Sequence, residues 1–188
     1  MSYLLIALLI ELLIFVHELG HFIAAKASGV AISRFSIGFG PKLWSRKIGN
    51  TEYRISAIPL GGYVMPAIND VSEFYHIPWK KRMVFAFGGP VANILFAIFG
   101  IMLLNVISQN ISFQSIFIDP VIRTVSYFYQ FICLIPLLFI QHQSLSGIVG
   151  IVSQGSHFVG FSIPRMLQFS VMLNVNLAVF NLLPLPPP

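Results

Sequence analysis

Long apolar stretches separated by short polar segments dominate this chain. A helix needs about 20 apolar residues to cross a hydrocarbon core about 30 Å thick. Three stretches meet that length: residues 3–25, 83–107 and 166–183. A fourth, residues 121–140, is interrupted by Arg123, Ser126, Gln130 and Pro136. The pattern predicts an α-helical membrane protein with about three transmembrane helices and one extra apolar segment.

Residues 30–66 have a different pattern, in which glycine and proline separate short β-prone runs. Gly49-Asn50 lies between polar and β-branched residues and predicts a hairpin turn. We expect a small β-loop beside the membrane or partly inserted in it. At membrane depth such backbone survives only where its edges are paired or face water.

The segments between and within the spans carry weaker signals. Gly88-Gly89-Pro90 predicts a break early in the second span, and Gly, Ser and Gln predict a loop over residues 141–164. Ser170, Asn174 and Asn181 recur at spacings of four and seven, so they share one helical face. A polar face in a membrane helix is expected to point into the bundle.

Composition and charge support a membrane protein of a single domain. Charged residues make up 9% of the 188 residues, against roughly 25% in soluble chains. Most basic residues lie between the first two spans: Lys26, Arg34, Lys42, Arg46, Lys47, Arg54, Lys80, Lys81 and Arg82. This clustering is typical of a cytoplasmic loop and argues against nucleic-acid binding. The single cysteine, Cys133, excludes an intramolecular disulfide.

One motif in the first span predicts chemistry. His17-Glu18-Leu19-Gly20-His21 is an H-E-x-x-H sequence, which places both imidazoles on one helical face where they can hold a zinc ion. Glu18 lies beside them and can take a proton from metal-bound water. The alternative is an interfacial cap of the span. An ionisable residue at mid-bilayer costs at least about 2.5 kcal/mol, which favours a functional cluster.

Further motifs follow in order along nearly the whole chain: Phe35-Ser36-Ile37-Gly38-Phe39-Gly40, Pro59-Leu60-Gly61-Gly62-Tyr63-Val64, Gly89-Pro90-Val91-Ala92-Asn93 and Asn181-Leu182-Leu183-Pro184-Leu185-Pro186. With His17–His21 they resemble the site-2 protease family of intramembrane zinc metalloproteases, most closely the bacterial regulator-of-sigma-E type.

The resemblance implies a function. His17 and His21 would bind Zn²⁺, Glu18 would activate zinc-bound water, and the β-loop would hold the substrate as an extended strand. Asn93 and Asn181 would bind substrate backbone or orient the site; interhelical hydrogen bonding is the alternative for both. Substrates would be single-pass membrane proteins, such as anti-sigma factors or remnant signal peptides. The enzyme would lie in the bacterial inner membrane, with its active site toward the cytoplasm.

The chain departs from the family pattern in two ways. The family's third zinc ligand is an aspartate in an L-D-G element, which would fall one residue beyond Pro188. The family type also carries PDZ domains, for which the connection after the second span is too short. We therefore expect a fragment of an active enzyme, or alternatively a catalytically inactive membrane scaffold. A channel or transporter would explain intramembrane charges but not the H-E-x-x-H spacing.

Topology constrains the fourth apolar segment. If Asn181–Pro186 is to approach His17 and His21, the third span must run from outside to inside. Residues 121–140 are then expected to lie along the outer interface or to re-enter the membrane. Glu11 shares the helical face of Glu18, seven residues away. It is expected to line a water path, or to be a protonated or interhelically bonded acid.

Overall fold

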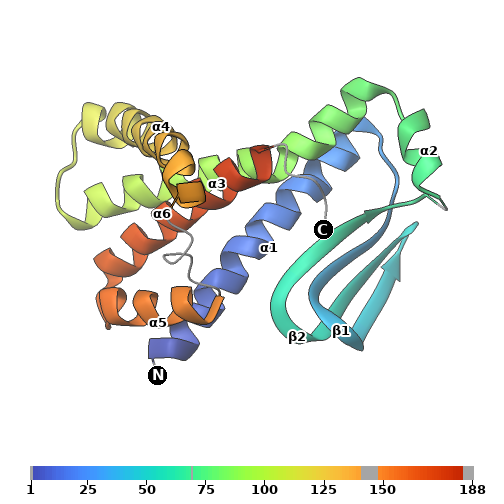
Figure 1. Ribbon diagram of the computed structural model, residues 1–188, viewed down its shortest axis with the longest axis horizontal. Coiled ribbons are helices and arrows are strands. Elements are labelled where there is room, and N and C mark those ends of the chain that lie inside the picture. The colour runs from blue at the N-terminus through green and yellow to red at the C-terminus, as the bar shows by residue number, and fades with distance from the viewer. Residues whose placement is uncertain (1, 69, 141–147, 184–188) are drawn as a thin grey trace. The chain divides into compact units, whose positions relative to one another are not determined.

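The computed structural model describes residues 2–68, 70–140 and 148–183 (Figure 1). The chain forms two compact units. Unit 1 comprises Met1–Ile10 and Asn93–Pro188, and unit 2 comprises Glu11–Ala92. Helices α1 (Ser2–Ser28) and α3 (Trp79–Ile107) each contribute residues to both units.

Unit 2 contains the β-loop that the sequence predicts. Strands β1 (Ile32–Ile48) and β2 (Thr51–Pro66) pair and are joined at Gly49-Asn50, where Gly49 has a φ of 60°. In this register Phe35 lies opposite both Tyr53 and Val64, so this part of β1 has a partner in each half of β2. The predicted hairpin turn is thus confirmed. A short helix, α2 (Val71–His76), leads from β2 to α3.

Aromatic side chains pack the β-loop onto α1. The ring centroids of Phe22 and Phe35 are 5.2 Å apart. The centroid of Phe15 lies 6.0 Å from that of Phe35, and the centroid of Tyr53 lies 5.8 Å from that of Phe22. Aromatic pairs at these separations contribute about 0.5–1.5 kcal/mol each beyond the area that they bury. Next to them lies an apolar core of Ala25, Val30 and Ile32, contacted by Phe22, Val64, Ile77 and Phe85. This packing holds the strands against the helix that carries the H-E-x-x-H motif.

Within unit 2, α1 and α3 cross closely because glycines face each other. A Cβ atom added to Gly88 would lie 2.5 Å from the Gly20 carbonyl oxygen and 2.6 Å from the Ala24 Cβ. Small residues allow such approach in membrane helices. The predicted break at Gly88-Gly89-Pro90 is wrong, because α3 continues through Pro90. Pro90 removes one backbone donor, and neighbouring helices make this tolerable in a membrane helix.

Unit 1 is built from helices around an apolar core. After α3 come a short π-helical turn (Gln114–Ile118), α4 (Asp119–Ile140), α5 (Ile148–Val159) and α6 (Ile163–Leu182). The core residues come from α3 and α6: Ala97, Ile101, Val171, Val175 and Val179. Helix α5 lies within the segment predicted as a loop, of which residues 141–147 are outside the described part. Its Gly, Ser and Gln residues are tolerated because the face at Gly155 packs against Phe169.

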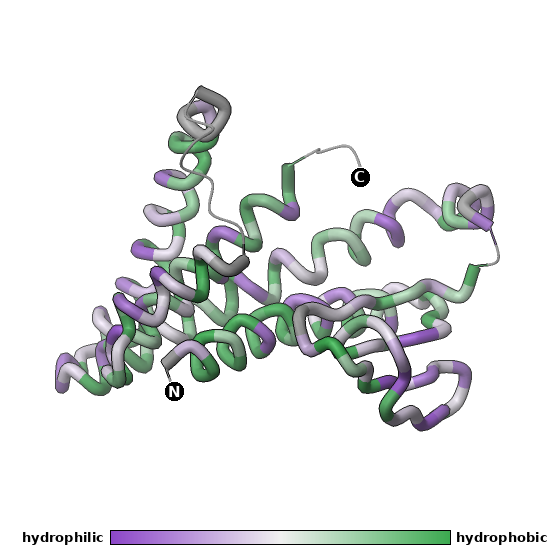
Figure 2. Tube along the Cα trace, turned by 60° about the horizontal axis from the view of Figure 1, so that its bottom comes forward, coloured by the Kyte–Doolittle hydropathy of each residue, from purple (hydrophilic) through white to green (hydrophobic). Residues whose placement is uncertain are grey.

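Within the described residues, three helices are long and apolar enough to cross a membrane: Tyr3–Ser28, Trp79–Ile107 and Ile163–Leu182. Figure 2 shows hydrophobic residues along these helices. On α1 the exposed residues include Leu4, Leu8 and Leu12, which are 64%, 57% and 46% exposed. Their spacing of four gives the helix an outward apolar face, as expected for contact with lipid. The predicted fold class, an α-helical membrane protein with a small β-loop, is confirmed.

Candidate active site

The two histidines of the motif converge on one point. His17 and His21 are one helical turn apart on α1, and their Nε2 atoms are 3.1 Å apart. Two imidazole nitrogens bound to one tetrahedral zinc ion at 2.0–2.1 Å would be about 3.3 Å apart. The side chains are therefore already arranged as a pair of ligands to a single metal ion.

A backbone contact orients the His21 ring. Its Nδ1 lies 2.8 Å from the Phe85 carbonyl oxygen on α3. A carbonyl oxygen can only accept, so Nδ1 carries the proton and the Nε2 lone pair points toward His17. The Gly89 amide nitrogen is 3.4 Å from the same Nδ1, which is too long to compete with the shorter bond. Metal-binding histidines are commonly fixed by a contact of this kind.

Gly89 provides the space in which the two imidazoles meet. A Cβ atom at this position would lie 2.6 Å from Nε2 of His17 and would also collide with Nε2 of His21. Gly89 and His17 are buried, and His21 is partly buried. Gly89 was not among the residues predicted for the site. Its signals were the Gly88-Gly89 pair inside an apolar span, which indicated a helix break, and the Gly89–Asn93 motif, which the family resemblance places at the border of the active site.

Glu18 lies against the last part of β2. A Cβ atom at Gly62 would be 3.2 Å from Cγ of Glu18, and the Val64 backbone N–H donates a hydrogen bond to the Glu18 carboxylate. Residues 62–65 of β2 pair with residues 34–37 of β1 on one edge. The Glu18 contact therefore places a possible proton acceptor directly beside a strand.

No third ligand joins the two histidines within the described part of the chain. Among these residues there is no group of three His, Cys, Asp or Glu side chains that could hold a metal ion. The two imidazoles and the space that Gly89 leaves fit a zinc ion, and a catalytic zinc ion ordinarily has three protein ligands and a water.

The two predicted asparagines belong to unit 1. Asn93 is fully buried on α3, and Asn181 is exposed on α6, where its Nδ2 donates to the Leu177 carbonyl oxygen at 2.8 Å. Ser170 and Asn174 are buried, as expected for an inward polar face, but Asn181 is not. The Asn181 bond is intrahelical rather than interhelical. The binding roles of Asn93 and Asn181 stay predictions.

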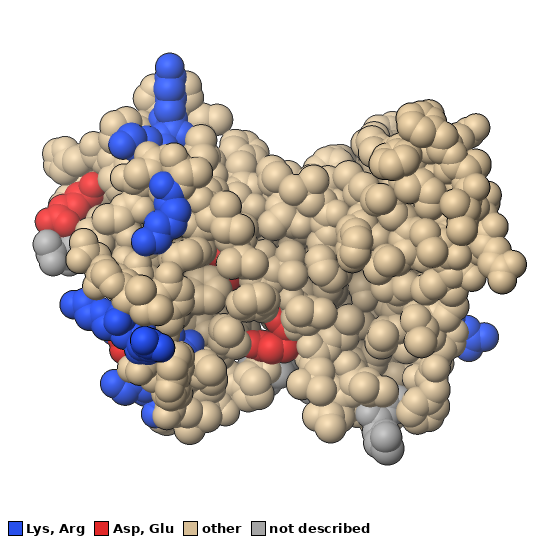
Figure 3. All heavy atoms as spheres, turned by 180° about the vertical axis from the view of Figure 1, so that it is seen from behind, with Lys and Arg blue, Asp and Glu red and all other residues tan. Residues whose placement is uncertain are grey.

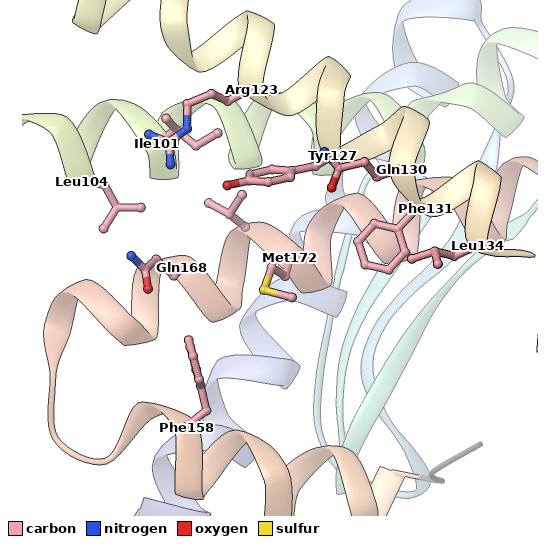
Figure 4. Close-up of a pocket in the computed structure, with 11 residues that line it drawn as sticks. Ile101, Leu104, Arg123, Tyr127, Gln130, Phe131, Leu134, Phe158, Gln168 and Met172 are labelled. Carbon is pink, nitrogen blue, oxygen red and sulfur yellow. The ribbon is translucent and has the colours of Figure 1, made fainter. Parts of the chain in front are cut away.

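Unit 1 also contains a cavity of about 310 Å³, shown in Figure 4. Its polar lining residues are Arg123, Tyr127, Gln130 and Gln168, and the rest of the lining is apolar. None of the residues predicted for the site lines it. We do not assign the candidate active site to this cavity, because His17, Glu18 and His21 lie in unit 2.

Basic side chains gather on unit 2. Figure 3 shows them on its surface, and nine of the eleven Lys and Arg residues of the chain fall within Glu11–Ala92. They lie at the end of α1, in the β-loop and at the start of α3. The end of α1 that follows His21 is therefore the basic end.

Comparison with known proteins identifies relatives of the chain. The sequence model of Peptidase family M50 matches residues 3–187. A protein of Chlamydia trachomatis named "Putative zinc metalloprotease" is 45% identical over 115 residues, which are 52% of this chain and 18% of that protein. Proteins with the same name from Helicobacter pylori and Vibrio cholerae are 44% and 43% identical over 48% and 51% of this chain. The matched parts cover only 29% and 24% of those two proteins.

Proposed function

This chain belongs to Peptidase family M50, and on this premise we propose that it is an intramembrane zinc metalloprotease that cleaves transmembrane segments of single-pass membrane proteins. The observation that carries the proposal is the 3.1 Å approach of the His17 and His21 Nε2 atoms, with Glu18 between them in sequence and against β2. A third zinc ligand is expected from outside the described residues.

The chain's own groups have distinct tasks in this proposal. Zinc, when bound, would lower the pKa of water and polarise the peptide carbonyl. His17 and His21 would hold it, with His21 fixed by the Phe85 carbonyl. Glu18 would take a proton from the attacking water as the oxygen bonds to the carbonyl carbon. It would then deliver that proton to the leaving nitrogen as the C–N bond breaks.

The β-loop can replace hydrogen bonds that a helical substrate loses when it unwinds. In a membrane helix each peptide carbonyl is hydrogen-bonded within the helix, and no water is present to replace that bond. A substrate must therefore unwind locally to expose a peptide bond. Residues 62–65 of β2 lie beside Glu18 and could supply replacement bonds by strand addition. Asn93 and Asn181 are proposed to bind substrate backbone or orient the site.

The basic end of α1 indicates which side of the membrane the H-E-x-x-H motif faces. Basic residues concentrate on the cytoplasmic side of membrane proteins. We therefore place His17, Glu18 and His21 toward the cytoplasmic side of a bacterial inner membrane. The third span would run inward, and α4 would lie at the outer interface or re-enter. Substrates of this class would include anti-sigma-factor-like proteins and remnant signal peptides.

A reconstituted cleavage assay tests the proposal. The full chain is placed in lipid vesicles with a peptide that carries one apolar transmembrane segment and water-soluble ends. We expect cuts within the apolar segment that stop on zinc chelation and return when zinc is restored, read by mass spectrometry. A matched peptide with the soluble ends alone should stay intact. Cleavage of the soluble ends only, or binding of the substrate without any cleavage, would contradict the proposal; the second result would favour the inactive scaffold.

A further inference from the structure

A second acidic residue of α1 contacts β2. The Gly61 backbone N–H donates to Oε2 of Glu11 at 2.8 Å. The other oxygen, Oε1, is buried and has no hydrogen-bond partner among the described residues. The partner of Glu11 is thus the β-loop backbone rather than another helix, which was one of the alternatives that the sequence left open.

Glu11 and Glu18 hold the same stretch of β2 at two points. Seven residues of α-helix rise about 10.5 Å. The corresponding amides, Gly61 and Val64, are three residues apart, which is about 10 Å in an extended strand. The two spacings match, so the strand can run along α1 with one amide bonded to each carboxylate.

The conformation of Gly61 makes this double contact possible. In a regular strand, amides three residues apart point to opposite edges. Gly61 is buried and has a φ of 133°, which departs from strand geometry and is open to glycine alone. A Cβ atom there would also collide with the Phe39 ring. The backbone turns at Gly61 so that this amide reaches the same helix as Val64.

From these contacts we infer that Glu11 is a positioning residue, which fixes the register of β2 on α1 so that residues 62–65 present their edge beside Glu18. Without the Glu11 bond, Glu18 is the one of these two carboxylates left to hold residues 61–65, and this stretch of β2 can shift along the helix. The aromatic packing still keeps the rest of the β-loop on α1. The consequence for substrate binding rests on the proposed function. The register itself does not, because it is a property of the protein without substrate.

Two substitutions of similar size distinguish the effect of the hydrogen-bond acceptor at position 11 from the effect of side-chain volume. Glu11→Gln keeps an oxygen that can accept the Gly61 N–H, whereas Glu11→Met removes the acceptor and fills the space. Neither variant should impair insertion, because each replaces an ionisable group within a membrane span. Zinc content should be unchanged in both, since Glu11 is about two helical turns from the histidines.

Hydrogen exchange and steady-state kinetics of the full chain in lipid discs provide the readouts. We expect Glu11→Met to speed exchange of the amides of residues 61–65 by about tenfold, as for the loss of one backbone hydrogen bond. It should raise KM for the transmembrane peptide by about tenfold with little change in kcat, and Glu11→Gln should restore both. Unchanged exchange at residues 61–65 in Glu11→Met, or equal effects of the two variants, would overturn the inference. If wild-type protein cleaves nothing, the proposed function fails while the exchange comparison still decides the register.

Discussion

Glu18→Gln is expected to lower the rate of peptide cleavage by roughly 10²–10⁴-fold, the usual contribution of a general acid–base. Glutamine has the same shape and its side-chain oxygen can still accept the Val64 N–H, so the strand should stay in place. Only the ability to take a proton from water is lost. The measurement is the initial rate of cleavage of the reconstituted transmembrane peptide.

The zinc content of the Glu18→Gln protein is the control for this variant. His17 and His21 are untouched, so zinc should bind as in wild type and the thermal midpoint should be unchanged. A variant that binds zinc and retains more than about a tenth of the wild-type rate would contradict the role given to Glu18, because a general base contributes at least about 10²-fold.

Gly89→Ala is expected to prevent zinc binding, although it changes neither a ligand nor a charge. The new methyl group would occupy the space where the two Nε2 atoms meet, 2.6 Å from that of His17. Loss of a positioning contact around a metal typically costs 10–100-fold in affinity. A direct collision with both ligands should cost at least about 100-fold, and cleavage should fall with it. Zinc affinity measured by competition with a chelator checks the first effect.

Gly100→Ala is the matched control on the same helix. Its Cβ atom would meet a single methyl group, Cγ2 of Val171, at 2.8 Å. Alanine is otherwise the better helix former by about 1 kcal/mol, so any general effect of the substitution on α3 is shared. We expect Gly100→Ala to bind zinc like wild type. Equal zinc affinities of Gly89→Ala and wild type would show that the imidazoles do not meet at this position.

Local patterns predicted the elements of this protein well. Apolar runs predicted the three spans, and glycine punctuation predicted the β-loop with its turn at Gly49-Asn50, because both signals depend on near neighbours in sequence. The pairing of His17 with His21 was predictable for the same reason, since a spacing of four residues fixes them on one helical face. Helix α5 was missed because its Gly, Ser and Gln residues favour a loop, whereas in the structure it forms a helix that packs against α6.

Contacts between distant residues were beyond the sequence. Glu11 and Gly61 are 50 residues apart, and Phe85 is 64 residues from His21. Such contacts depend on how β2 and α3 pack on α1, and the local pattern of apolar and polar residues contains no information about that packing. For the same reason Gly89 was predicted to help break a helix, whereas in the structure its missing side chain leaves room for the His17 and His21 imidazoles.

The metal content of the purified full chain shows directly whether His17 and His21 bind zinc. Zinc is measured by mass spectrometry for the wild-type protein and for a variant in which His17 and His21 are both replaced by alanine. We expect about one zinc ion per wild-type chain, as in a mononuclear catalytic site, and none above background in the variant. Zinc that persists in the variant, or a wild-type protein that binds none when zinc is supplied, would contradict it.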